Sequence, residues 1–334
     1  MGKHYHINYG VRQTHKLRNL VAAIVCLSIV GLSAYPIASN SFKRNTVAVT
    51  KTAQNQVSQA QAKAALPQIT TPMPWPNYGY AAYSVPKDEL FASSTKSAQP
   101  VPIASLAKII TVLAILKEKP LQVGEQGPMI TLDEQDAALV GEYARKSGTY
   151  APVVVGEQIS QYQALQAILL LSANNMADSL ARWAFGSVDE YVTYANKMLK
   201  DLSIDNSTVA DASGFSPQTV STAEDMTKIG FLYMQNSVLR EIVMQQQAKI
   251  PVAGIIRNYN SFANENGIVG IKIGNTDEAG KTYLAASIRK SSDGTEELSV
   301  AAVLGAKSLN IAAKDAATIL KAGNNGHDKL EKNL

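Results

Sequence analysis

Three apolar segments of β type follow one another late in the chain and constrain its fold most. They are IVGIKIG, KTYLAASIR and LSVAAVLGA, which begin at Ile268, Lys281 and Leu298. The connecting stretches NTDEAG and KSSDGTEE are rich in residues that favour turns. Because such short connections favour antiparallel pairing, we expect these segments to form an antiparallel meander.

Helical patterns fill most of the chain between a first β hairpin and this meander. The hairpin is predicted from AAYSV and ELFAS, which flank the turn residues Pro-Lys-Asp. Apolar spacing predicts helices over 105–117, 187–202 and 221–236, a helix pair over 159–184 broken near Ser172, and a closing helix over 312–322. Ser187 is a candidate N-cap, and a capping box is expected either from Thr222 to Asp225 or from Ser221 to Glu224. This order of elements predicts one α+β or α/β domain.

The charge of the chain is distributed unevenly. The sequence has 31 Lys and Arg against 27 Asp and Glu, a net of +4, yet no acidic residue precedes Asp88. Nine basic residues lie before that position, so the remainder has 31 − 9 = 22 basic and 27 acidic residues, a net of −5. This balance disfavours a nucleic-acid-binding face on the main body.

Residues 20–38 form an uncharged run of 19 positions. As a helix it would measure about 28 Å, close to the thickness of the hydrocarbon core of a bilayer. Because only basic residues precede the run, the positive-inside rule predicts a cytoplasmic segment over 1–19 and a domain on the extracytoplasmic face of the cell membrane. We expect a single-pass transmembrane anchor, and the alternative is a signal peptide whose cleavage releases a secreted domain.

The stretch that follows predicts a tether. Residues 39–78 are rich in Ala, Gln, Ser, Thr and Pro and show no apolar periodicity, which is typical of an extended linker. The folded domain is then expected over 79–322, with a polar tail over 323–334.

Histidine and cysteine are nearly missing from the body of the chain. His4, His6, His15 and His327 all lie near a terminus, and we expect them outside the folded core. Cys26 is the single cysteine, so no disulfide can form within the chain. A Ser-His-Asp triad, a Cys-His pair and a histidine-ligated zinc are therefore disfavoured. The base of a hydrolase would have to be Lys, Asp, Glu or Tyr.

A serine paired with a lysine is the remaining route to an activated nucleophile. Ser105 and Lys108 form S-x-x-K at the start of an apolar helix, where positions i and i+3 share a face. Burial would lower the pKa of the lysine toward the range in which it acts as a base. The same pattern at Ser84, Ser93 and Ser287 falls on or beside predicted strands, where i and i+3 face opposite sides. The alternative role for Ser105 is a helix N-cap.

Two further short motifs follow in the chain. Ser172-Ala173-Asn174 lies where the helix pair is broken, and Lys272-Ile273-Gly274 lies on the first strand of the meander. A strand edge with a lysine and a glycine can bind an extended peptide by β-addition. Each motif is weak alone, because S-x-N and K-x-G recur elsewhere. The three motifs in this order, separated by 67 and 100 residues, are far more specific.

In these residues the chain resembles the penicillin-recognising serine DD-peptidases, specifically the low-molecular-weight D-alanyl-D-alanine carboxypeptidases. The resemblance covers about residues 79–320. The matching stretches are PIASLAK (102–108), LLLSANNMADSLA (169–181), DASGFSP (211–217), STAEDM (221–226), GIKIGNTDEAGKTYLAAS (270–287) and VLGA (303–306). The resemblance implies the β-lactamase-like fold, in which an antiparallel sheet flanked by helices meets an all-helical lobe at a cleft.

The resemblance also implies catalytic roles. Ser105 would attack the carbonyl of the terminal D-Ala-D-Ala bond of a peptidoglycan stem peptide. Lys108 would act as the base, and Ser172 would relay a proton to the leaving D-alanine. No metal or organic cofactor would be required, and β-lactams would acylate the same serine as covalent inhibitors.

Substrate-binding roles follow from the same resemblance. Asn174 would hold the substrate amide, and Lys272 would orient the site electrostatically, with Gly274 allowing close approach on the same strand. The backbone N–H groups of Ser105 and Asn275 would form the oxyanion hole, a contribution typically worth about 3 kcal/mol.

Two departures from the family pattern concern the substrate carboxylate. Ile273 replaces the threonine of the third motif, whose hydroxyl usually donates a hydrogen bond to the substrate carboxylate in the family. Isoleucine cannot donate this bond, and losing a hydrogen bond to a charged group costs roughly 1.5–3 kcal/mol. The family also often places an arginine a few residues after VLGA, where this chain has SLNIA at 308–312.

We therefore expect an anchored carboxypeptidase that takes part in cell-wall remodelling. The alternatives on the same scaffold are a DD-endopeptidase or weak transpeptidase, and a catalytically impaired domain that binds the wall or senses β-lactams. A β-lactamase would need a deacylating carboxylate near Ser105, for which Glu157 is the candidate by distance along the chain.

Overall fold

The computed structural model describes residue 69 and residues 72–94, 98–260, 267–290 and 294–331. The expected cytoplasmic segment and apolar run, residues 1–38, lie outside these ranges, as does most of the expected linker. Within the described ranges, no helix is both long enough and apolar enough to cross a bilayer.

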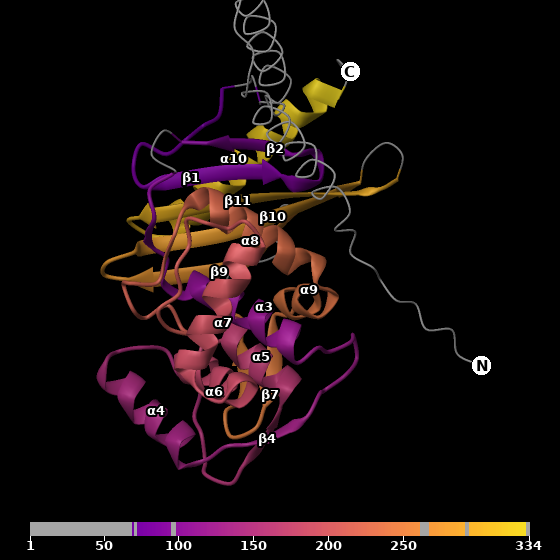
Figure 1. The fold of residues 1–334 in the computed structure, drawn as a ribbon. Coiled ribbons are helices and arrows are strands. Elements are labelled where there is room, and N and C mark those ends of the chain that lie inside the picture. The colour runs from indigo at the N-terminus through magenta and orange to yellow at the C-terminus, as the bar shows by residue number, and fades with distance from the viewer. Residues whose placement is uncertain (1–68, 70–71, 95–97, 261–266, 291–293, 332–334) are drawn as a thin grey trace, which may run out of the picture. The chain divides into compact units, whose positions relative to one another are not determined.

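A five-stranded antiparallel sheet forms one layer of the domain (Figure 1). Its strand order is β2-β1-β11-β10-β9. The strands are β1 (Tyr80–Val85), β2 (Leu90–Ser93), β9 (Ile268–Thr276), β10 (Gly280–Lys290) and β11 (Glu296–Ala306). The predicted hairpin and meander are both confirmed. The first strand pairs with the last, so that Tyr83 lies opposite Ala301.

The two faces of this sheet pack against different apolar clusters because side chains alternate along a strand. Ala302 and Leu284 belong to the large cluster of the helical lobe. Their neighbours Ala301 and Tyr283 belong to a smaller cluster under the C-terminal helix α10, Leu309–Glu331. Figure 1 shows α10 crossing the strands on the side away from α8.

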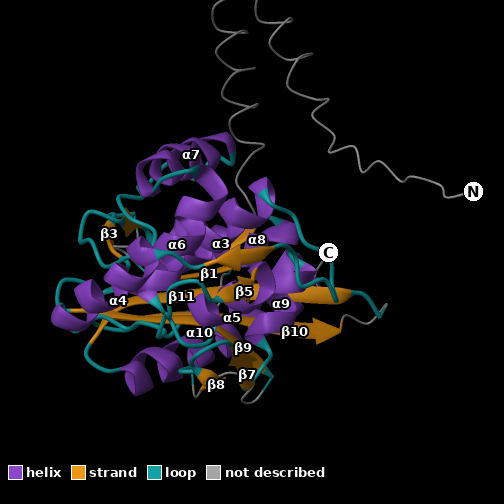
Figure 2. Cartoon of the chain, turned by 90° about the horizontal axis from the view of Figure 1, so that it is seen from below, coloured by secondary structure: helices purple, strands orange, loops and turns teal. Residues whose placement is uncertain are grey.

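The helical lobe is built between β2 and β9. Its helices are η2 (Ala104–Leu106), α3 (Ala107–Glu118), α4 (Glu134–Arg145), α5 (Gln161–Leu169), α6 (Asn174–Phe185), α7 (Val188–Asp201), α8 (Ala223–Gln235) and α9 (Ser237–Val243). Three small two-stranded sheets pair β3 (Val101–Pro102) with β6 (Val220–Ser221), β4 (Met129–Thr131) with β5 (Gln158–Ser160), and β7 (Gln247–Ile250) with β8 (Gly254–Arg257). Figure 2 shows α7 at the margin of the lobe.

The predicted helices are present, with small changes at their ends except for the closing helix, which was expected over 312–322 and is Leu309–Glu331. The pair over 159–184 is broken at Ser172 as expected, and the side chains of Ser187 and Thr222 accept the backbone N–H groups of Glu190 and Asp225. The patterns missed α4 and α9 and the β7–β8 hairpin. Helix α4 buries only two side chains and α9 has 7 residues, so neither carries a long apolar stripe.

Described residues beyond both expected bounds of the domain pack on its body. Helix α10 continues into the expected polar tail as far as Glu331, because Asn324 and His327 are only 6% and 4% exposed and make contacts with the sheet. At the other end, Met73, Trp75 and Tyr78 pack on the smaller cluster, and Tyr78 donates to Asp315 of α10. The last residues of the expected linker therefore belong to the folded body.

Candidate active site

The three motifs meet in one cleft of about 230 Å³. Strand β9, the edge strand nearest the helical lobe in Figure 1, forms one side of it. The lining residues are Ser105, Ser147, Gly148, Thr149, Ser172, Asn174, Gly214, Phe215, Tyr259, Ile273, Gly274, Asn275, Thr276 and Leu309. Five of the seven residues predicted for the site are in this list, and Lys108 and Lys272 lie buried directly behind it.

Ser105 lies in a strained turn. It is the middle residue of the 3-10 turn η2, so the α-helix begins at Ala107 rather than at the predicted residue 105. The preceding Ala104 has φ of +49°, in the left-handed region. A Cβ added at Gly214, which has φ of +76°, would lie 1.8 Å from the Ala104 carbonyl oxygen. Glycine is therefore required there, and its close approach fixes the turn that presents the serine.

Lys108 is fully buried with three hydrogen-bond partners. Its Nζ lies 2.9 Å from Ser105 Oγ, 2.7 Å from Asn174 Oδ1 and 2.6 Å from the Ser213 carbonyl oxygen. Burial lowers the pKa of Lys108 to about 7, although the negative charges of Asp211 and Asp178 oppose this shift. A lysine with this pKa is neutral often enough near pH 7 to accept the Ser105 proton.

Ser172 and Lys272 form a second hydroxyl–amine pair. Ser172 has φ of +61°, in the turn that joins α5 to α6. Lys272 Nζ donates to Ser172 Oγ and to the Ile273 carbonyl oxygen, each at 3.0 Å. Burial and the neighbouring charge of Lys108 lower the pKa of Lys272 well below its usual value. The lysine thus links the lobe to β9 at the base of the cleft.

The predicted binding residues take three different positions. Asn174 begins α6 and its side-chain oxygen accepts from Lys108, so the structure places it against the base. A Cβ at Gly274 would lie 3.0 Å from the Ser105 backbone nitrogen and 2.4 Å from Thr282 Oγ1. This crowding explains the glycine. Asn275 is exposed at the cleft, where its carboxamide oxygen accepts from Lys281.

A buried carboxylate that the sequence reasoning missed lies behind the base. Asp178 accepts a hydrogen bond of 2.6 Å from Tyr143 Oη of α4, and burial raises the pKa of Asp178 to about 7. Asp178 lies four residues after Asn174, so the two share a face of α6. The four-residue spacing from Asn174 could have identified Asp178 from the sequence. Tyr143 lies on α4, a helix that the apolar spacing did not predict.

Asp211 shapes the loop that holds Lys108. Its Oδ2 accepts from Ser213 Oγ at 2.7 Å and from the Phe215 backbone N–H at 2.8 Å. These bonds direct the Ser213 carbonyl toward the lysine. This aspartate of the stretch DASGFSP holds the loop whose Ser213 carbonyl binds Lys108 and whose Gly214 and Phe215 line the cleft.

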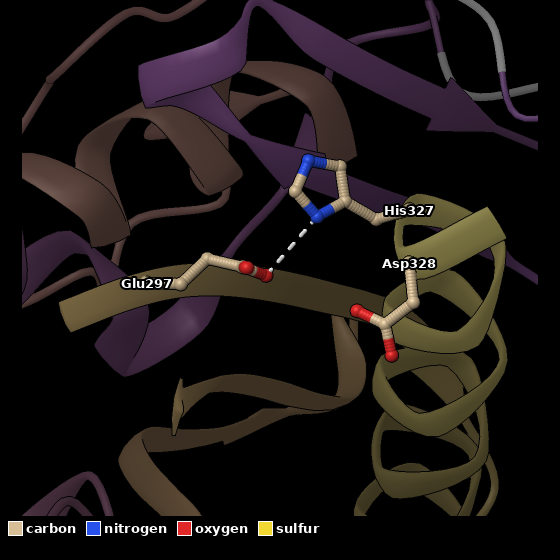
Figure 3. Close-up of side chains that lie close together, drawn as sticks. All are labelled: Glu297, His327 and Asp328. Atoms are coloured by element: carbon tan, nitrogen blue, oxygen red, sulfur yellow. Dashed lines mark ion pairs between the residues drawn. The ribbon is translucent and has the colours of Figure 1, made fainter. Parts of the chain in front are cut away.

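One group among the described residues could hold a metal ion by its donor types and spacing: Glu297, His327 and Asp328. The histidine was predicted to lie outside the core, but it is buried, with Nδ1 3.2 Å from Glu297 (Figure 3). Its Nε2 lies 3.2 Å from Asp88. Arg289 donates to both Glu297 and Asp328 and already compensates their charge. We interpret the group as an ion-pair cluster that fixes the end of α10.

The candidate β-lactamase carboxylate does not lie in the cleft. Glu157 is absent from the residues that line it, and its backbone pairs with Val154 and Leu132 in the loop before β5. The chemistry available in the cleft is thus a serine hydroxyl beside a lysine of lowered pKa, with a second hydroxyl held by a second lysine. This arrangement suits acyl transfer through a covalent serine ester.

Comparison with known proteins gives consistent matches. The model of a protein family described as D-alanyl-D-alanine carboxypeptidase matches residues 91–308 of the chain. The D-alanyl-D-alanine endopeptidase of Pseudomonas aeruginosa is 30% identical over 189 residues, which cover 54% of this chain and 57% of that protein. The Escherichia coli D-alanyl-D-alanine carboxypeptidase DacC is 26% identical over 227 residues, which cover 66% of this chain and 54% of that protein. The chain thus spans about half the length of these relatives.

Solved structures support the fold. A D-alanyl-D-alanine carboxypeptidase from Mycobacterium tuberculosis aligns with a TM-score of 0.65 at 23% identity, covering 76% of this chain and 93% of that one. The Streptomyces K15 DD-transpeptidase aligns with a TM-score of 0.67 at 21% identity, covering 76% of this chain and 99% of that one. The predicted architecture of an antiparallel sheet flanked by helices is confirmed.

Proposed function

Because the chain belongs to the D-alanyl-D-alanine carboxypeptidase family of serine peptidases, we propose that it hydrolyses the terminal D-Ala-D-Ala bond of peptidoglycan stem peptides. The observation that carries the proposal is the 2.9 Å contact between Ser105 Oγ and the buried amine of Lys108. Burial holds the pKa of this lysine at about 7, which suits a general base. The activity would place the protein in cell-wall remodelling and make it a target of β-lactams.

The proposed reaction has two halves. Lys108 takes the proton of Ser105, and Oγ forms an ester bond with the carbonyl carbon of the penultimate D-alanine. Backbone N–H groups of Ser105 and Asn275 would stabilise the oxyanion. The C–N bond then breaks, and Ser172 passes a proton to the amine of the leaving D-alanine. Water hydrolyses the ester, which restores the serine and releases the shortened peptide.

The first test is covalent labelling of the full chain by a fluorescent penicillin. We expect labelling of the wild-type protein and none of Ser105→Ala, because only the serine can form the ester. Release of D-alanine from a diacetyl-L-Lys-D-Ala-D-Ala peptide then separates a peptidase from a β-lactam sensor. A folded wild-type protein that takes no label would favour the impaired wall-binding domain.

An endopeptidase is the second candidate. It is favoured by the Pseudomonas aeruginosa relative and by an Escherichia coli relative of the same printed name, which is 29% identical over 128 residues. An endopeptidase would cut a D-alanyl bond inside a cross-link rather than at a chain end. Digestion of purified cross-linked muropeptides distinguishes the two, because only an endopeptidase converts dimers to monomers.

We also propose that residues 20–38 anchor the protein in the cell membrane, with the domain on the extracytoplasmic face. The length of the uncharged run and the basic residues before it support this proposal. Alkaline carbonate should leave the wild-type protein in the membrane pellet and release a Val25→Lys, Leu27→Lys double variant. A wild-type protein found in the medium without residues 1–38 would instead establish a cleaved signal peptide.

A further inference from the structure

A second pocket, the side pocket, adjoins the catalytic cleft. It has a volume of about 590 Å³ and shares four lining residues with the cleft: Ser147, Phe215, Asn275 and Thr276. The loop after Asp211 and the turn after β9 complete its lining together with residues at the end of α4. Because the shared residues border both spaces, a substrate held in the cleft can extend into the side pocket.

The proposed reaction determines which part of a substrate lies nearest the side pocket. The leaving D-alanine lies beside Ser172, which Lys272 of β9 holds by a hydrogen bond. The oxyanion lies at the backbone N–H groups of Ser105 and Asn275, and Asn275 is three residues further along the strand than Lys272. The acyl part of the substrate therefore lies toward Thr276 and the turn that follows, where the side pocket opens.

Strand β9 can hold this acyl part in an extended form. Within the described sheet it is an edge strand that pairs only with β10, so its free side can accept a peptide as an added strand. A strand advances about 3.3 Å per residue. The residue directly before the two D-alanines of a substrate thus lies beside the turn at Asp277, at the opening of the side pocket.

Part of the side pocket is apolar. Phe215 and Pro217 supply this apolar surface. The ring of Phe215 lies edge-on to that of Tyr143, with the ring centroids 5.8 Å apart. Tyr143 is itself buried and donates a hydrogen bond to Asp178, so the aromatic pair has a fixed position. The methylene groups of a long substrate side chain can pack on this surface.

The charged residues of the side pocket are mainly acidic. Three carboxylates line it, those of Asp211, Asp277 and Glu278. One ammonium group lines it as well, that of Lys146, but this group is already paired with Glu142 at 2.6 Å. The lining therefore favours a positively charged ligand group over a negatively charged one.

Two of the three carboxylates can bind a ligand. Asp211 accepts hydrogen bonds from its own loop, whereas Asp277 and Glu278 are exposed and make no ion pair with any other described residue. Lys281 lies next to the pocket, where its amine donates to Asn275. With Lys281, Lys146 and its partner Glu142 included, four carboxylates and two ammonium groups leave a net charge of −2.

We propose that the side pocket binds a side chain that ends in a primary ammonium group and belongs to the residue directly before the two D-alanines, with Asp277 and Glu278 as its partners. This inference rests on the proposed acyl-transfer function and specifies the acyl part of its substrate as a D-alanyl peptide with a lysine-like residue at that position. The methylene groups of the side chain pack on Phe215 and Pro217. The bonds that form and break are those of the proposed reaction, because all these contacts lie on the acyl side of the scissile bond.

The test compares two peptides on the full-length protein that differ by one acetyl group. Nα-acetyl-L-Lys-D-Ala-D-Ala has a free side-chain amine, and in the diacetyl peptide this amine is blocked. We expect kcat/KM, measured from D-alanine release at low ionic strength, to be at least about threefold higher for the free amine, as exposed charge pairs would give. A smaller ratio, or a preference for the diacetyl peptide, would overturn the inference alone. Cleavage of neither peptide would overturn it together with the proposed function.

Two variants and a matched control locate the effect. Asp277→Asn combined with Glu278→Gln should bring the ratio close to one and leave kcat/KM for the diacetyl peptide within about twofold of the wild-type value, because the blocked side chain carries no charge. Glu278→Lys alone should lower the ratio in the same direction if the double variant fails to fold. Glu134→Gln combined with Asp205→Asn removes the same charge at exposed carboxylates outside both linings and should leave the ratio unchanged. A ratio unmoved in the pocket variants, or lowered equally in the control, would overturn the assignment of Asp277 and Glu278.

Discussion

The helical side of the cleft consists mainly of hydrogen-bonded polar groups, whereas the strand side presents apolar and exposed side chains. On the helical side the Lys108 amine has three hydrogen-bond partners, and a glycine, Gly214, lies where a Cβ would clash with the backbone. On the side formed by β9 and α10, Ile273 and Leu309 present apolar surface, and Asn275 is exposed. The comparison shows that several independent contacts fix the positions of Ser105 and Lys108, the groups proposed to perform acyl transfer. On the strand side, Ile273 instead packs on the apolar cluster under α10, and Asn275 accepts a hydrogen bond from Lys281.

The largest expected effect removes the base from the helical side. Lys108→Gln keeps much of the side-chain volume but cannot accept the Ser105 proton, so the acylation rate should fall by about 10²–10⁴. The measurement is the time course of fluorescent penicillin labelling at pH 8. Lys146→Gln is the matched control, because that lysine is half exposed and pairs only with Glu142. A loss of less than tenfold at Lys108 would contradict the assignment of the base.

The next effect tests the glycine that fixes the turn before Ser105. Gly214→Ala adds a Cβ 1.8 Å from a backbone oxygen at φ of +76°, and should lower the free energy of unfolding by about 2–4 kcal/mol. Gly156→Ala is the control, because it has φ of +84° but no atom within 4 Å. It should cost only the left-handed backbone term, about 1 kcal/mol. Denaturant titration measures both, and equal losses would show that crowding is not the reason for Gly214.

The smallest expected effect is a shift in the pH dependence of the acylation rate. Acylation needs neutral Lys108, so its rate should rise with pH through the lysine pKa of about 7. The negative charge of Asp178 raises that pKa, so Asp178→Asn should move the midpoint to lower pH by about one unit or less. Asparagine can still accept from Tyr143. Glu142→Gln, an exposed change nearby, should move the midpoint far less because solvent screens its charge. A midpoint unmoved in Asp178→Asn would show that Asp178 does not tune the base.

Sequence reasoning found the residues whose chemistry depends on local spacing. Ser105 and Lys108 are three positions apart, which places them on one face of a helical turn. The spacing of apolar residues changes at the helix break that carries Ser172 and at the strand that carries Lys272, so both elements can be recognised in the sequence. These features need no knowledge of distant parts of the chain. The same is true of the meander and the N-caps.

The features that were missed depend on contacts between segments far apart in the sequence. His327 is buried because Asp88, 239 positions earlier, and Glu297 lie on either side of it. Asp178 is held by a hydrogen bond from Tyr143 of α4, 35 positions earlier. A polar tail and a surface helix therefore look alike in sequence, and only packing distinguishes them.

The pairing of β1 with β11 has a consequence for how the chain is made. Residues 86–295, 210 positions, separate the two strands, and β11 lies between β1 and β10 in the sheet. Until the last strand leaves the ribosome, the sheet consists of two unconnected parts with open edges. The domain therefore cannot close before β11 has been made, and a chain that stops before Glu296 carries strand edges that favour aggregation. A stop just before Glu296 removes 334 − 295 = 39 residues and with them the strand that joins the two parts of the sheet.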